Sequence, residues 1–215
     1  MPGIGHIEDY YAWHWGNSLF VVLDPFWYSA GKSRQAGDHW NQTLGVDQYQ
    51  WLKRTLETSD AKFKFIFIHH LIGGADKNNR GGIDSTPHFE WGTQELDRKN
   101  TLAQNRPGWK SPIHDLLVKH DVSVVFHGHD HLYAKEELDG VIYQAVPQPG
   151  HPRFGNVRSA EEYGYDGDVI SSSGHLRSNV SDEFARVDYV RAYLPENETR
   201  SRRNAEISDS YLIQD

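Results

Sequence analysis

Cysteine is absent from the 215 residues, and methionine occurs only once. The absence of cysteine excludes disulfide bonds and thiolate ligands, but it suits either side of a membrane and so leaves the compartment open. No apolar run approaches the length of about 20 residues that a membrane-spanning helix requires. We therefore expect no membrane partner for this chain.

Basic residues are also scarce, with 22 Lys and Arg against 30 Asp and Glu, which gives a formal net charge of -8. A nucleic-acid-binding protein needs a basic face to neutralise phosphates, so we expect no nucleic-acid partner. The acidic balance does not exclude a small anionic substrate, because a bound metal ion supplies local positive charge that composition does not show.

The composition of 37% hydrophobic and 24% charged residues is typical of a globular protein. Three short runs rich in Val, Ile and Phe predict strands that are buried on both faces of a sheet; they are Ser18–Asp24, Lys62–His70 and Val122–Gly128. The length suits one domain, and we treat residues 1–215 as a single unit.

Helical patterns separate these predicted strands. Val46, Tyr49, Leu52 and Leu56 recur at helical spacing, and a second helix is predicted within Ser111–Asp121. The alternation of strands and helices favours an α/β fold with a partly parallel sheet.

The C-terminal part has a different pattern. Asp139-Gly140 is a strong signal for a two-residue hairpin turn between two short strands. Asp168–Leu176 and Phe184–Leu194 predict further strands, so we expect an antiparallel sheet that packs on the first. Two long connections, Pro25–Thr43 and Ile72–Gly108, are long enough to suggest functional loops.

Histidines gather at the ends of two predicted strands. The second strand finishes in a pair of histidines, and the third is followed by a turn with more; in chain order they are His69, His70, His127, His129 and His131. Because ligands bind at the carboxyl ends of strands in open α/β sheets, we expect these imidazoles to meet at one rim.

Neutral imidazole is a ligand suited to Zn, Fe, Ni and Cu, and Gly128 would let the backbone turn tightly beside an ion. We therefore expect His69, His129 and His131 to bind divalent metal. His127 has two open interpretations, a metal ligand or a residue that supports the ligands through a bond to a carbonyl. A single strand-end histidine such as His69 can also be a polar cap or a satisfied core residue.

Two segments together resemble a known family. "FKFIFIHHLIGG" and "VVFHGHDHLYAKEEL" look like the last two metal-binding blocks of the calcineurin-like metallophosphoesterases, which include the purple acid phosphatases. "YYAWHWGNSLFVVLD" is similar to the strand pair that precedes those blocks in secreted bacterial members. The resemblance implies an α/β/β/α sandwich in which His69 and His129 share one ion and His131 binds its neighbour. It also implies Fe, Zn or Mn as the metal, and export to the periplasm or the extracellular space.

The N-terminal motifs of that family are missing. No Asp is followed two residues later by His, and no Gly-Asp pair has the second Asp that the family requires. The two Gly-Asn pairs, Gly16-Asn17 and Gly155-Asn156, are not followed by His. We therefore expect an incomplete sandwich that corresponds to the C-terminal portion of a longer enzyme. Without a bridging carboxylate, a single ion held by three imidazoles is an alternative to the family's pair.

The resemblance implies metal-dependent hydrolysis of small phosphate esters. With the family's usual proton donor absent, His70 and His88 are the candidates to protonate the leaving oxygen. Arg80 is a candidate to meet the phosphate, and Trp27 and Trp91 are candidates to shape the substrate side.

Two other interpretations stay open. The first is that the chain is a catalytically inactive fragment. Such a fragment would bind at most one metal, or would pair through an exposed sheet edge with a chain that supplies the missing half. Carbohydrate binding by clustered tryptophans is a further possibility, and exposed tryptophans gathered on one face of the molecule would favour it.

Overall fold

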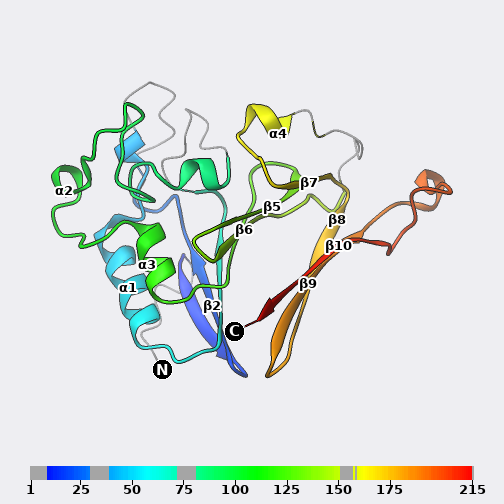
Figure 1. Cartoon of the computed structure of the whole chain (residues 1–215), viewed down its shortest axis with the longest axis horizontal. Coiled ribbons are helices and arrows are strands. Elements are labelled where there is room, and N and C mark those ends of the chain that lie inside the picture. Colours follow the sequence, from blue (N-terminus) through cyan, green and yellow to red (C-terminus); the bar gives the residue numbers. More distant parts are fainter. Residues whose placement is uncertain (1–8, 30–38, 72–80, 151–156, 158, 215) are drawn as a thin grey trace.

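The computed structural model describes residues 9–29, 39–71, 81–150, 157 and 159–214. A seven-stranded mixed sheet has the order β1-β2-β3-β4-β6-β5-β7, and a three-stranded antiparallel sheet has the order β10-β9-β8. Figure 1 shows helices beside one face of the large sheet and the small sheet beside the other.

The large sheet contains β1 (Tyr11–Trp15), β2 (Ser18–Leu23), β3 (Phe63–Ile68), β4 (Val124–His127), β5 (Leu132–Leu138), β6 (Val141–Ala145) and β7 (Asp168–Ser171). The small sheet contains β8 (Gly174–Val180), β9 (Phe184–Arg191) and β10 (Ile207–Gln214). The α-helices are α1 (Gly45–Glu57), α2 (Leu102–Asn105), α3 (Ile113–Lys119) and α4 (Ser159–Glu162). Three 3₁₀ turns complete the described elements: η1 (His39–Asn41), η2 (Ile83–Ser85) and η3 (Pro195–Asn197). No described helix has the length and apolar character that crossing a membrane demands.

The three apolar runs form the centre of the large sheet, as predicted. Strands β2, β3, β4 and β6 are mutually parallel, and their last residues lie in register: Leu23 beside Ile68, Ile68 beside His127, and His127 beside Ala145. The carboxyl ends of four neighbouring strands therefore reach one level, and the residues that follow them share a rim.

Helices α1 and α3 cover one face of this sheet. The predicted helix is present as α1, and Tyr49, Leu52 and Leu56 pack in one core cluster with strand residues such as Ile66. Val46, which shares their helical spacing, is 58% exposed. At about 100° per residue it lies roughly 120° around α1 from Leu52, outside the buried face of the helix.

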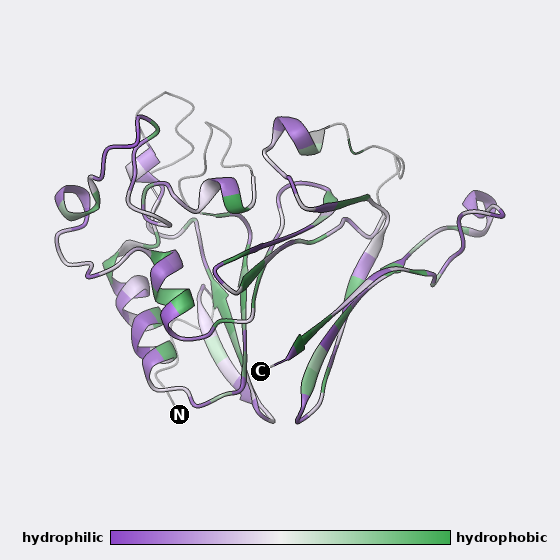
Figure 2. Cartoon of the chain, in the orientation of Figure 1, coloured by the Kyte–Doolittle hydropathy of each residue, from purple (hydrophilic) through white to green (hydrophobic). Residues whose placement is uncertain are grey.

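The small sheet covers the other face, as expected for the C-terminal strands. Phe65 and Phe126 of the large sheet share a core cluster with Ala185 and Val187 of β9. Figure 2 shows hydrophobic residues gathered along the strands, while the outer sides of the helices are hydrophilic. The α/β class is confirmed, as a helix layer, a mixed sheet and a second sheet among the described residues.

Two details differ from the expected strands. The run Asp168–Leu176 forms two strands, β7 and β8, which belong to different sheets. Strand β10 was not predicted. The hairpin at Asp139-Gly140 is confirmed, with positive φ angles of 50° and 81° that suit this turn.

Candidate metal centre

Three imidazoles meet where strands β3 and β4 end. His69, His70 and His129 each offer one ring nitrogen, and these three atoms lie within 4.8 Å of one another. Nε2 of His69 is 3.2 Å from Nδ1 of His129. The ring centroids of the three pairs are 5.3–5.5 Å apart. We call this group the histidine cluster.

The parallel pairing of β3 and β4 produces this approach. The Gly128 N–H donates to the carbonyl of His69 over 2.9 Å, which continues the strand pairing by one more bond. His129 then takes a left-handed backbone conformation, with φ at 74°. A positive φ is uncommon for a residue with a side chain, and such outliers concentrate at functional sites.

The tight turn that we expected at Gly128 is located one residue later. Gly128 is not among the described glycines with positive φ, and a Cβ added there would come no closer than 3.5 Å to another atom. The left-handed conformation belongs to His129, and neither the φ angle of Gly128 nor the space around it calls for a glycine. The convergence that the glycine was expected to allow is nevertheless present.

A buried layer lies behind the cluster. His127 stacks on Tyr165 at a centroid distance of 6.2 Å, and burial lowers the pKa of His127 to about 4. The Tyr165 hydroxyl donates to Oδ2 of buried Asp130 over 3.0 Å. Asp130 was not singled out from the sequence, although its place between His129 and His131 could have drawn attention to it. Through Tyr165, this carboxylate anchors the segment that presents His129.

The other predicted site residues lie elsewhere. His131 is exposed, and among the described residues it belongs to no group of three or more donors that could hold an ion. His88 lies partly buried in the loop after η2, outside the cluster. Arg80 falls outside the described residues. The metal assignment of His131 and the catalytic assignment of His88 stay predictions.

The two tryptophans proposed for the substrate side differ in position. Trp27 is 59% exposed in the turn that follows β2. Trp91 is fully buried, and its Nε1–H donates to the Tyr143 hydroxyl over 3.1 Å. The prediction that Trp91 shapes the substrate side is wrong, because its ring lies inside the core.

Exposed tryptophans also occur on β1. Trp13 is 40% and Trp15 is 78% exposed, which is the gathering that the carbohydrate interpretation requires. The ring of Trp13, however, stacks on Tyr11 at 5.8 Å and on Phe20 at 5.0 Å. Because a sugar packs on an open ring face, these contacts disfavour a row of aromatic platforms on this strand.

The donor set fits a single ion. Metal–nitrogen bonds of 2.0–2.1 Å in tetrahedral geometry place two ligand nitrogens about 3.3 Å apart. The 3.2 Å between His69 and His129 matches this spacing, and the third nitrogen lies within reach of a small side-chain movement. Three neutral imidazoles bring no negative charge to offset the repulsion between two dications, so the cluster suits one ion better than two.

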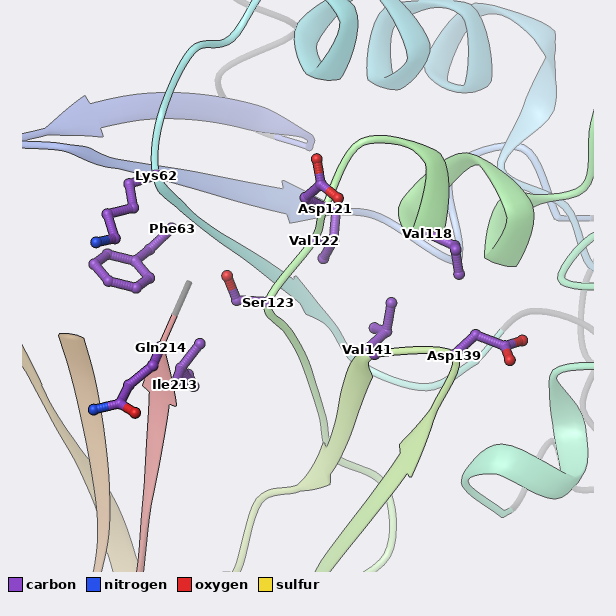
Figure 3. A pocket seen from close by; sticks show the side chains of 11 residues that line it. Lys62, Phe63, Val118, Asp121, Val122, Ser123, Asp139, Val141, Ile213 and Gln214 are labelled. Carbon is purple, nitrogen blue, oxygen red and sulfur yellow. The ribbon is translucent and has the colours of Figure 1, made fainter. Parts of the chain in front are cut away.

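A cavity of about 260 Å³ lies at the opposite end of the large sheet (Figure 3). Its lining includes Phe63 and Ser123, at the amino ends of β3 and β4, and Gln214 near the end of β10. This cavity is therefore distinct from the rim that carries the histidine cluster.

No protein-family model and no curated protein matches this chain. Several solved structures do, among them the following two. The first is a purple acid phosphatase from yellow lupin (Lupinus luteus) seeds, with 12% identity and a TM-score of 0.51, over 95% of this chain and 32% of that one. The second is GAP50, the anchor in the inner membrane complex of Plasmodium, with 10% identity and a TM-score of 0.51, over 95% of this chain and 53% of that one.

These likenesses concern the fold alone, at identities this low. The chain spans about a third of the first structure and about half of the second. The large mixed sheet, the helices on one face and the small sheet on the other are consistent with a partial metallophosphoesterase-like fold.

Proposed function

We propose that this chain carries a metal centre of a hydrolase that acts on small phosphate esters. One observation carries the proposal: imidazoles from two adjacent strands of a phosphatase-like fold converge at the carboxyl rim of the sheet. In the proposed centre, His69, His70 and His129 hold one divalent ion, with Zn, Fe and Mn as the candidates. A bound ion would supply positive charge for the phosphoryl oxygens and acidify a water molecule.

The protein's own groups position this chemistry. The hydrogen bond from Gly128 to the His69 carbonyl joins the two strand ends that present His69 and His129. Asp130 accepts a hydrogen bond from Tyr165 and so anchors the segment that presents His129. His70 is the buried member of the cluster, which favours a ligand role over the proton-donating role expected from the sequence.

Two roles expected from the sequence are kept as proposals. His88 is the proposed proton donor to the leaving oxygen, and His131 is the proposed ligand of a second ion when a carboxylate is supplied from outside the cluster. The same resemblance supports export to the periplasm or the extracellular space.

A second candidate is a catalytically inactive chain that binds one ion or pairs with another polypeptide. Two observations favour it: the chain spans only part of its structural neighbours, and the histidine cluster contains no carboxylate. Strand β1 would be the pairing edge, because it ends the large sheet and exposes Trp13 and Trp15.

Hydrolysis of p-nitrophenyl phosphate and of its bis ester, with Zn or Mn added, tests the proposal. We expect metal-dependent turnover that is lost in His129→Ala and retained in His175→Ala, which removes an exposed histidine on β8. Metal binding without turnover in the wild-type protein would favour the inactive candidate. Failure to bind any of the metals would contradict the metal centre and would leave only an inactive chain that pairs with another polypeptide.

A further inference from the structure

Phe26 lies against the histidine cluster. Its ring centroid is 5.6 Å from that of His69 and 5.3 Å from that of His70, the latter in an edge-on arrangement. The residue comes from the turn after β2, the strand next to β3, so three neighbouring strands contribute to this corner of the rim.

The turn holds Phe26 in place. Its N–H donates to Oδ1 of Asp24 over 2.7 Å, and its carbonyl accepts from the Ser29 N–H over 3.1 Å. Gln48, fully buried in α1, holds Asp24 from both sides: its Oε1 accepts from the Asp24 N–H and its Nε2 donates to the Asp24 carbonyl, each over 2.8 Å. The backbone that carries the aromatic ring is therefore held by the turn and by the buried side chain of Gln48.

Phe26 is also 49% exposed. Single exposed apolar residues are common on protein surfaces. Phe26 differs from these because it is held by the turn and because its ring touches two members of a candidate metal centre. A phosphoryl group is polar and anionic and makes no use of such a ring, whereas an apolar group attached to it would.

We propose that Phe26 forms an aryl subsite beside the metal centre, so that the favoured substrates are phosphate esters whose organic group is aromatic. The proposal rests on the proposed function for the position of the phosphoryl group. Offset or edge-to-face contact between the substrate ring and Phe26 would add to affinity, and alkyl esters would lack this contact.

Binding of phenylphosphonate and methylphosphonate to the zinc-loaded protein, measured by calorimetry, tests the subsite without any need for turnover. We expect phenylphosphonate to bind about fivefold tighter than methylphosphonate, a ratio typical of one aromatic contact. Phe26→Ala should bring the ratio close to one. Phe26→Leu, which keeps an apolar group against the imidazoles, should reduce it at least about twofold.

Trp15→Ala is the matched control, because it removes a more exposed aromatic ring at the other end of β2, where Trp15 pairs with Ser18. The ratio should be unchanged in this variant. A wild-type ratio near one would overturn the aryl subsite, and so would a ratio that both Phe26 variants preserve.

These titrations, together with the hydrolysis assay, separate this inference from the proposed function. An aryl preference that disappears in Phe26→Ala, without any hydrolysis by the wild-type protein, would support the subsite and contradict the hydrolase. Turnover with equal binding of the two phosphonates would support the hydrolase and overturn the subsite. Absence of binding of zinc, iron and manganese would overturn both.

Discussion

The most demanding stability prediction concerns Glu90. Its side chain is fully buried and accepts hydrogen bonds from the Thr43 hydroxyl at 2.5 Å, from the Leu44 N–H at 3.0 Å and from Nε of Arg106. Its backbone carbonyl accepts from the Ile113 N–H over 2.8 Å. One residue thus joins the beginning of α1, the loop after α2 and the beginning of α3.

The magnitude follows from these partners. Hydrogen bonds to a charged group contribute about 1.5–3 kcal/mol each, and removing one member of a buried ion pair costs about 3–5 kcal/mol. Glu90→Gln keeps the shape but loses the charge and turns an amide N–H₂ toward a donor, so we expect a loss of about 2–3 kcal/mol. Glu90→Ala should lose about 3–5 kcal/mol, because Arg106, whose side chain is only 16% exposed, keeps a charge without its carboxylate.

Urea unfolding followed by tryptophan fluorescence measures these losses. Glu183→Gln, at an exposed position in the turn before β9, is the matched control and should change stability by less than about 0.5 kcal/mol. The double variant Glu90→Ala with Arg106→Met should cost less than the sum of the single changes, because it removes both charges. A loss below about 0.5 kcal/mol in Glu90→Gln, together with additive single changes, would refute the reasoning.

Two further predictions concern backbone packing and pH. A Cβ on Gly92 would lie 2.1 Å from the Pro87 backbone, so Gly92→Ala should lower the melting temperature strongly, whereas Gly108→Ala, with open space around it, should change it little. Equal melting temperatures for these two variants would contradict the packing around Gly92. Burial lowers the pKa of His120, so the unfolded chain takes up its proton first, and the stability that this residue contributes is complete above about pH 6.5 and is lost as the pH falls. His120→Gln should therefore lose less stability than the wild type between pH 7.5 and pH 5.5 in thermal melts, and an identical loss would contradict this account.

The sequence predicted the centre of the sheet because buried parallel strands are continuous apolar runs. The three runs became β2, β3 and β4 to within one or two residues at each end. Strand β10 escaped prediction because its apolar residues lie on both sides of the strand. Tyr211 and Ile213 pack toward the small core cluster, while Leu212 between them is 55% exposed.

The histidine cluster was predicted in part. The approach of His69 and His129 follows from parallel strands that end at one level, and this much is readable from the sequence. The approach of His70 to these two residues was not, because adjacent residues point to opposite faces only while a strand continues, and β3 ends at Ile68. The position of Phe26 depends on hydrogen bonds from α1 and the turn, which no local pattern reveals.

Zinc titration by calorimetry of the wild type, His70→Ala and His131→Ala tests the central claim most directly. The account predicts one zinc ion per wild-type chain, with affinity reduced at least about a hundredfold in His70→Ala, since even residues behind metal ligands contribute 10–100-fold. His131→Ala should bind zinc nearly as tightly as the wild type. Loss of binding in His131→Ala with full binding in His70→Ala would contradict the claim that His69, His70 and His129 hold the ion.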